Sequence, residues 1–329
     1  MNNLNDRYSD IVFFLKVVST RFCEDNNIKL NIIIPDEYIL NAKVEKLAQN
    51  EYQIYIYPKC LDLGNFIGNI TRRYTEDDLQ TFSAFKHLGI FERHEEDTYR
   101  EELNNLFSTI ILLQIFWHEV GHIRAGYVDR TRDYIEFDSS EKGCYSKQEQ
   151  EMVADWLSTK KVFFAMYNLA KNKVENDKEL IKVLQQLVML YWISLTIEFQ
   201  IFDSNHKREI KDFSKLSHPY PSVRLLYSID AMTEAIMDIL NTYGIDDAVA
   251  GLAIQEIFKD IACIIHSFLL ITECPIDYYR EDKRVVECYY TLRKLPYSVE
   301  YEKNDFLHLL PLDESYINAF SIFFPFQRE

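Results

Sequence analysis

The scarcity of glycine and proline is the feature that most constrains the fold of this chain. Only 8 Gly and 8 Pro occur among 329 residues. A fold built from many short strands needs many tight turns, and tight turns depend on these two residues. The composition therefore favours long helices joined by few turns. Because 47% of the residues are hydrophobic, the chain also has enough apolar side chains to form a full core.

Helical spacing of apolar residues begins over residues 10–23 and dominates the chain from about Thr98. The first long helix is predicted from Thr98 to Ala125, ending at Gly126, because glycine commonly follows the last helical residue. A capping box formed by Ser146 and Glu149 predicts the start of the next helix. The further helices are predicted over residues 76–87, 146–172, 177–202, from after Ser217 to near Gly244, and over residues 246–271.

Two strand candidates lie before residue 60. Residues 29–34 form a β-branched run that ends at Pro35, and residues 52–57 form a second run that ends at Pro58. We expect them to share a small sheet, with antiparallel pairing. The predicted fold class is mainly α with a small N-terminal β-sheet (α+β). The predicted organisation is an N-terminal helix and sheet layer (1–97), a helical catalytic core (98–275) and an extension packed on it (276–329).

Charge and cysteine content restrict the partners and the compartment. A net charge of −16 disfavours a nucleic-acid partner, because phosphate contacts need clustered Lys and Arg. The six cysteines include no CxxC pair, which is typical of reduced thiols. The N-terminus lacks a signal pattern, and polar residues such as Gln114 and Glu198 interrupt the apolar stretches. We therefore expect a soluble, cytoplasmic protein with no membrane span.

The segment His118-Glu119-Val120-Gly121-His122 is an HExxH motif on the first long helix. Residues four apart lie on one helix face, so the two imidazoles can bind one ion. Zinc lowers the pKa of a bound water, and Glu119 is then positioned to accept its proton. The alternative is a pair of core histidines that bond to the backbone.

A zinc site needs a third protein ligand, and the next helix offers one. Glu151 and Asp155 are four residues apart, so Glu151 can bind the metal while Asp155 accepts the free ring N–H of a ligand histidine. Gly121 and Ala154 are small enough to let the two helices approach closely. Glu149 is the alternative ligand, and an exposed acidic helix start is the structural alternative.

A third polar feature is His218-Pro219-Tyr220-Pro221-Ser222-Val223-Arg224. A helix is predicted to begin at Pro219, where the missing N–H costs nothing. In a peptidase, His218 could then donate a hydrogen bond to the oxyanion of the tetrahedral intermediate. Arg224 could do the same, or could bind a carboxylate such as Asp155. The alternative is an ordinary capping histidine and a surface arginine.

The segments HEVGH, EMVAD and HPYPSVR together resemble the gluzincin metallopeptidases, in the order seen in the heat-shock and prenyl-protein endopeptidases. The resemblance covers about Trp117 to Arg224. It implies zinc bound by His118, His122 and Glu151, with Glu119 as general base. It also implies that Asp155 orients a ligand ring and that His218 and Arg224 act in the transition-state and structural shell.

Many members of that group are embedded in membranes, whereas this chain is predicted to have no spanning segment, which argues against a membrane-protein substrate. The layout also resembles the soluble Lit-type phage-exclusion peptidases. The predicted function is thus a soluble zinc endopeptidase that cuts a specific protein or peptide, with an activating partner as an expected form of control. The polar loop 129–144 would act as a lid, and Cys144 in it could block the open zinc position.

Two alternatives remain open from the sequence. One is a regulatory or binding protein on a peptidase scaffold, with a structural or inactive zinc site and partner recognition by the acidic surface and the aromatic C-terminal tail. The other is a zinc hydrolase acting on small amides. No nucleotide-binding glycine motif and no G-x-S-x-G motif occurs, so neither nucleotide chemistry nor a serine hydrolase is predicted.

Overall fold

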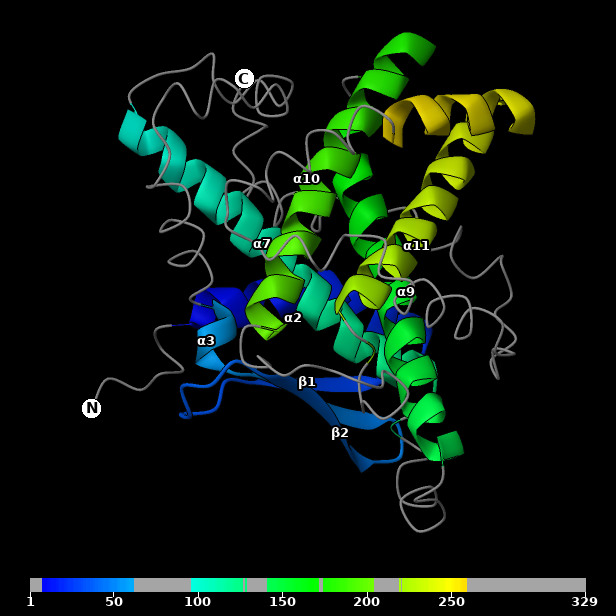
Figure 1. Ribbon diagram of the computed structural model, residues 1–329. Coiled ribbons are helices and arrows are strands. Elements are labelled where there is room, and N and C mark those ends of the chain that lie inside the picture. Colours follow the sequence, from blue (N-terminus) through cyan, green and yellow to red (C-terminus); the bar gives the residue numbers. More distant parts are fainter. Residues whose placement is uncertain are drawn as a thin grey trace.

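The computed structural model describes most of the N-terminal two thirds of the chain, and its helices lie beside one small sheet (Figure 1). This confirms the predicted class, mainly helical with a small N-terminal sheet. The predicted domain boundaries stay predictions. The described residues are 8–61, 96–126, 128, 141–171, 174–203, 219 and 221–258.

The N-terminal helix α2 (Ser9–Asp25) packs through one apolar face. Phe14, Leu15, Val18 and Phe22 are buried and recur every three or four residues, which is the spacing of one helix face. The chain then reverses at Asn27, whose φ of 50° lies in the left-handed region that asparagine tolerates. The turn leads directly into the first strand.

The sheet has three strands in the order β1-β3-β2, with β1 (Lys29–Ile33), β2 (Ala42–Ala48) and β3 (Glu51–Ile56). β1 pairs with β3 in parallel, and β2 pairs with β3 antiparallel. The predicted antiparallel pairing of the two sequence-identified strands was wrong. The missed strand β2 is the reason, because it forms a hairpin with β3 and so returns β3 to the direction of β1.

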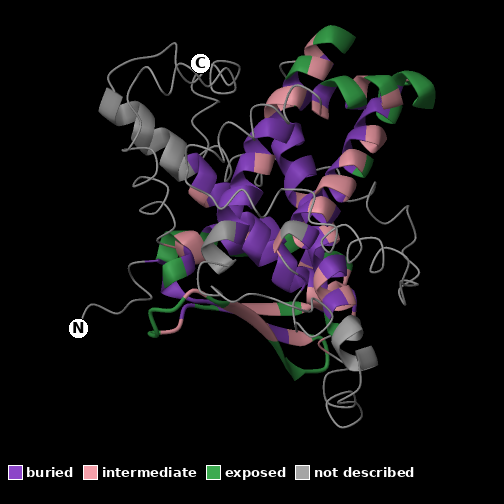
Figure 2. Ribbon diagram, viewed as in Figure 1, coloured by how far each residue is buried: buried purple, intermediate pink, exposed green. Residues whose placement is uncertain are grey.

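One face of the sheet packs against the helices (Figure 2). In β3, Tyr52, Ile54 and Ile56 are buried, whereas the residues between them are only partly buried. This alternation follows from the two-residue period of a strand. β2 is mostly exposed along its second half, and its Lys and Glu residues gave it no continuous apolar run that the sequence could reveal.

Four long helices form most of the rest of the described core: α7 (Glu96–Arg124), α9 (Glu141–Ala170), α10 (Asp177–Asp203) and α11 (Pro221–Thr242). α7 is central, and its residues from Leu106 to Val120 are almost all buried (Figure 2). Its neighbours α9 and α10 are also buried along much of their length. The predicted first and third long helices are confirmed to within two residues at each end.

Two helix starts differ from the predictions. α9 begins at Glu141, five residues before Ser146, so the predicted capping box lies inside the helix. α11 begins at Pro221 and not at Pro219. A residue that precedes proline is disfavoured in the helical region, so the second proline, with its fixed φ, becomes the first helical residue.

Glycine ends two of the helices as expected. Gly126 follows α7 with φ 70°, and Gly244 follows α11 with φ 72°. The next predicted helix is present over residues 247–258, and the Asp246 carboxylate caps it by accepting the Ala248 N–H at 2.9 Å. The predicted helix 76–87 and the C-terminal extension lie outside the described residues.

Two described helical stretches are long and apolar enough to cross a membrane, Leu106–Arg124 and Asp177–Phe199. Within the protein, 89% and 67% of these stretches are buried. Mostly buried core helices of soluble proteins can have the same length and composition. The absence of a membrane span and the cytoplasmic location stay predictions.

Candidate metal centre

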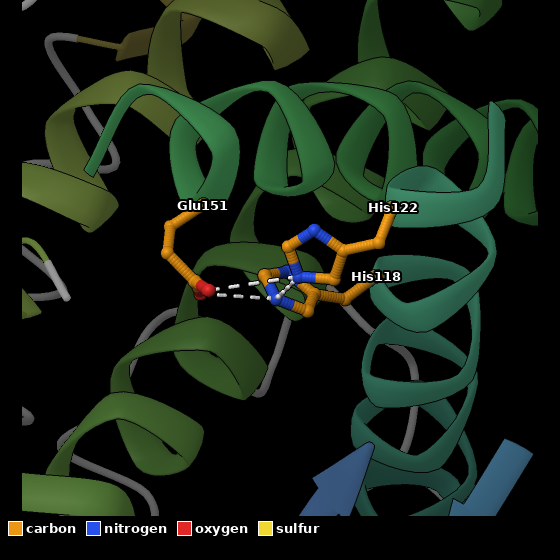
Figure 3. Close-up of side chains that lie close together, drawn as sticks. All are labelled: His118, His122 and Glu151. Carbon is orange, nitrogen blue, oxygen red and sulfur yellow. Dashed lines mark hydrogen bonds and ion pairs between the residues drawn. The ribbon is translucent and has the colours of Figure 1, made fainter. Parts of the chain in front are cut away.

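Three side chains from two helices converge at the middle of the helical layer (Figure 3). His118 and His122 project from α7, and Glu151 projects from α9 toward them. The Nε2 atoms of the two histidines lie 3.2 Å apart, and the Glu151 carboxylate oxygens lie 3.2 Å from His118 Nε2 and 3.6 Å from His122 Nε2. This group could hold one metal ion.

The distances within this triad fit a small tetrahedral ion. Ligands about 2.0–2.1 Å from such an ion are separated from one another by about 3.3 Å. The three measured separations, 3.2, 3.2 and 3.6 Å, fall close to that value. The converging carboxylate belongs to Glu151 and not to Glu149, which was the alternative ligand.

The close contact of α7 with α9 makes this convergence possible. Gly121 faces Ala154, and a Cβ atom at Gly121 would lie 2.9 Å from the Ala154 Cα and 3.1 Å from its carbonyl oxygen. Atoms essentially never approach a Cβ so closely. The absence of a side chain at Gly121 therefore allows the backbones to approach, as the two small residues predicted.

Asp155 orients the His118 ring from the side opposite the triad. Its Oδ1 lies 2.8 Å from His118 Nδ1. When Nδ1 carries the proton and donates it to Asp155, the lone pair of Nε2 points toward Glu151 and His122. Asp155 is 1% exposed, so this contact is almost fully removed from water. This is the geometry expected from the sequence, in which Asp155 accepts a ring N–H from a candidate ligand histidine.

Arg224 on α11 holds Asp155 in place. Its Nε donates to Asp155 Oδ2 at 2.7 Å and its Nη2 donates to Oδ1 at 2.6 Å, a bidentate pair. The guanidinium also lies over the Phe199 ring, 4.9 Å from its centroid. Of the two predicted roles, the structure shows the carboxylate contact. A contact of Arg224 with a transition state stays a prediction.

The pKa of Asp155 follows from these partners. Burial alone would raise the pKa of this carboxyl, but the charges of Arg224 and His118 and their hydrogen bonds hold it below its ordinary value. For His118, burial lowers the pKa, and the neighbouring Asp155 and Glu151 carboxylates raise it to about 10. Without a metal, a proton therefore resides on His118 between two carboxylates.

The other imidazole behaves in the opposite way. Burial lowers the pKa of His122 to about 4, and the Glu151 carboxylate offsets this only in part. His122 is thus neutral at neutral pH and offers a lone pair. The candidate site therefore holds a protonated imidazole, His118, next to a neutral imidazole, His122. A metal cation can replace that proton, so metal binding is coupled to proton release.

Glu119 is buried beside the triad. It is 7% exposed, and burial raises its pKa to about 7, with Glu151 adding to the rise and His118 and Arg224 opposing it. A carboxyl group with a pKa near neutral can both accept and return a proton at physiological pH. The chemistry suits the predicted general base, although its action on water stays a prediction.

Glu198 is an acidic residue that the sequence did not place near the site. It lies on α10, is buried, and has a pKa raised to about 8 by burial, with Arg224 opposing the rise. In the sequence it stood out only as a carboxyl interrupting an apolar helix. Its Oε2 is buried with no hydrogen-bond partner among the described residues, which is costly. The signal that the sequence offered was therefore this carboxyl within an apolar helix.

Some predicted site residues lie outside the described residues, and one lies in a different element from the one predicted. His218 lies outside the described residues, as do residues 129–140 of the predicted lid. Cys144 lies in the first turns of α9 and not in a loop, so the expectation of a loop cysteine was wrong. Residues 141–145 contain no proline, so the helix can extend back to Glu141.

Comparison with known proteins adds no assignment. No protein-family model matches the chain, and neither the characterised proteins nor the solved structures contain a match. The interpretation of the site therefore depends on its residues and their geometry.

Proposed function

We propose that this protein is a zinc-dependent hydrolase, and within that class an endopeptidase that cuts a specific protein substrate. The observation that supports the proposal most directly is the convergence of His118, His122 and Glu151, whose ligand atoms all lie within 4.8 Å of one another. Glu119, a buried carboxyl with a pKa near neutral, follows His118 in the chain.

Zinc is the metal that this donor set favours. Two imidazoles and one carboxylate are the three protein ligands of many catalytic zinc sites, which leave a fourth position open. All-oxygen sets favour Mg²⁺ and Ca²⁺, whereas imidazole nitrogen suits zinc. The contact between His118 and Asp155 is the type of hydrogen bond that fixes a ligand imidazole and makes it a better donor.

When bound, zinc supplies Lewis acidity for a carbonyl group and lowers the pKa of water. The residues of the chain then have distinct tasks. Glu119 accepts a proton from the attacking water and returns it to the leaving amine, which its near-neutral pKa allows. Asp155 and Arg224 keep the His118 ring in one orientation. His218 is proposed to donate a hydrogen bond to the developing oxyanion.

The choice of a peptide bond over another substrate is supported by the motif order. HEVGH, EMVAD and HPYPSVR follow one another as in the gluzincin endopeptidases. Residues of all three segments are in contact: Glu151 and Asp155 with His118, and Arg224 with Asp155. The similarity in layout to Lit-type peptidases extends the proposal to a cytoplasmic protein substrate, a role in phage exclusion and control by an activating partner.

A second candidate function has one observation in its favour. Arg224, Asp155, His118 and Glu151 form a continuous series of alternating charges that satisfy one another without a metal. Such a series could serve as a structural element of a regulatory or binding protein. This alternative predicts that the cellular effect of the protein survives loss of Glu119.

Metal content tests the proposed function first. Elemental analysis of untagged protein should give about one zinc per chain, and Glu151→Gln should lose most of it because one of three ligands is neutralised. Glu149→Gln is the matched control, two residues away on the same helix, and should keep the metal. A zinc-free wild-type protein after reconstitution would contradict the proposal.

Activity is tested separately with Glu119→Gln. This variant should retain zinc and fold but lose cleavage of a peptide library, since the amide cannot accept the proton from water. A panel of small amides distinguishes an amidase from a peptidase. Cleavage by Glu119→Gln at the wild-type rate would rule out the assigned general base.

A further inference from the structure

A continuous series of buried hydrogen bonds lies one helical turn from the metal centre. The Tyr191 hydroxyl on α10 donates to Gln114 Oε1 on α7. Gln114 Nε2 donates to Ser158 Oγ on α9 at 2.7 Å, and Ser158 Oγ donates to the Asp155 carbonyl oxygen at 3.0 Å. Gln114, Ser158 and Tyr191 are each at most 1% exposed.

The direction of each bond in this series is determined by chemistry. Burial raises the pKa of Tyr191 well above its ordinary value, so its hydroxyl keeps its proton and donates. The Gln114 carbonyl must then accept, which turns its amide nitrogen toward Ser158 and leaves the Ser158 proton for the Asp155 carbonyl. A glutamate at position 114 has no donor for Ser158, so an amide is needed there.

The hydrogen bond between Gln114 and Ser158 belongs to a row of polar contacts between α7 and α9. Gln114 faces Ser158, His118 faces Asp155, and His122 faces Glu151, so the residue numbers rise on α7 as they fall on α9. Gln114 lies four residues before His118, and Ser158 lies three residues after Asp155, which places each pair about one turn, ~5.4 Å, from the next.

This arrangement limits how α7 can move relative to α9. A slide of one helix along the other would break the hydrogen bond from Gln114 to Ser158 and leave buried polar atoms without partners, which is costly. The apolar side chains of the same interface impose no such directional requirement. Tyr191 extends the constraint to α10, so three helices are fixed at one place.

We propose that Gln114, Ser158 and Tyr191 are positioning residues that set the register of α7 against α9, and so hold His118 and His122 opposite Glu151 for metal binding. This inference depends on the proposed metal site. None of the three residues belongs to the triad of His118, His122 and Glu151, and they act through Asp155 and the two helix backbones.

The test uses the full chain with all three residues replaced by apolar ones of similar shape, Gln114→Met, Ser158→Ala and Tyr191→Phe. Replacing the three side chains together leaves none of the three with an unpaired polar group, so the fold is expected to persist. Zinc affinity, measured by competition with a chromophoric chelator, should weaken about tenfold or more, the lower end of what loss of a ligand-orienting contact costs. The cobalt-substituted protein should show an altered d–d spectrum.

Ser194→Ala is the matched control. It also removes a buried hydroxyl from α10, one that bonds the Leu190 carbonyl within the same helix at 2.8 Å. Its zinc affinity should stay within twofold of the wild type. Equal affinity in the triple variant and the wild type would overturn the proposal and reduce the series to a structural feature.

A second readout needs no metal. Histidine ¹⁵N NMR of the metal-free protein reports the His118 ring proton held by Asp155, which should be sharp in the wild type and in Ser194→Ala and broadened or lost in the triple variant. An unchanged signal in the triple variant would contradict the positioning role. A wild-type protein that binds no zinc would refute the proposed function alone, because the NMR comparison would still decide the role of the series.

Discussion

Helices α9 and α11 are joined by ion pairs that lie in different surroundings. Near the metal centre, Asp155 binds Arg224 through two hydrogen bonds, and their side chains are 1% and 14% exposed. Toward the other end, Lys160 binds Asp238 at 2.9 Å, and here the Lys160 side chain is 7% exposed but the carboxylate side chain of Asp238 is 37% exposed. The same two helices therefore carry one pair excluded from water and one pair partly in water.

The difference lies in what else each pair touches. Asp155 also orients His118, so the buried pair connects three helices to a candidate ligand. Lys160 contacts Glu234, whose side chain is 55% exposed, at 3.6 Å and lies over the Trp156 ring. Breaking a buried pair leaves an uncompensated charge, whereas a solvated carboxylate contributes little. The comparison shows that a buried ion pair can position a site residue when one of its members also binds that residue, as Asp155 binds His118.

The largest effect is expected for Asp155→Asn. The change keeps the shape of the side chain but leaves the Arg224 charge buried without its counterion, which should lower the free energy of unfolding by about 3–5 kcal/mol. Zinc affinity should fall by about 10- to 100-fold, because the His118 ring loses its charged partner. Urea denaturation and chelator competition measure the two quantities. A loss of stability below about 1 kcal/mol would remove the distinction between the two pairs.

The next largest effect is expected at the close contact between α7 and α9, where Gly121 faces Ala154. Gly121→Ala should cost about 1–3 kcal/mol of stability, because the added methyl group collides with the Ala154 backbone. Gly251→Ala is the control, since no atom lies within 4 Å of a Cβ at that helical position. There alanine should stabilise the helix by about 0.5–1 kcal/mol. Thermal or urea unfolding measures the stability of both variants, and equal changes in stability would contradict the expected collision at Gly121.

A pH effect is expected from Glu198, whose folded-state pKa of about 8 lies above its ordinary value of 4.5. Between these values the folded state keeps a proton that the unfolded state loses, so this group makes the protein less stable as pH rises. From pH 6 to 7, wild-type stability should fall relative to Glu198→Gln by up to about 1.4 kcal/mol. Urea unfolding of both proteins at the two pH values measures this. Parallel pH profiles would show that Glu198 keeps no proton in the folded state.

The smallest effect is expected for Asp238→Asn, the same substitution at the solvated pair. Lys160 keeps its contacts with Glu234 and Trp156, and the lost interaction is screened by water, so the cost should be about 0–1 kcal/mol. Zinc affinity should stay within twofold of the wild type. A cost comparable to that of Asp155→Asn would show that solvent exposure does not separate the two pairs.

The sequence predicted most of the helical architecture and the residues of the candidate metal site. HExxH on a helix and Glu151 four residues before Asp155 are local patterns whose helical periodicity sets which side chains share a face. The third strand and the parallel pairing of β1 with β3 were missed, because strand pairing joins segments distant in the chain. The starts of α9 and α11 were misplaced, since capping motifs and prolines allow more than one starting residue.

By itself, the sequence determined that His118 and His122 share one helix face, that Glu151 and Asp155 share another, and that Gly121 and Ala154 are small residues on those helices. These properties depend on helix geometry within each segment. Only the tertiary structure decided that Arg224 binds Asp155, that Glu198 is buried near the same charges, and that Gln114, Ser158 and Tyr191 form one series. The reason is that these contacts join different helices, and their geometry depends on how those helices pack.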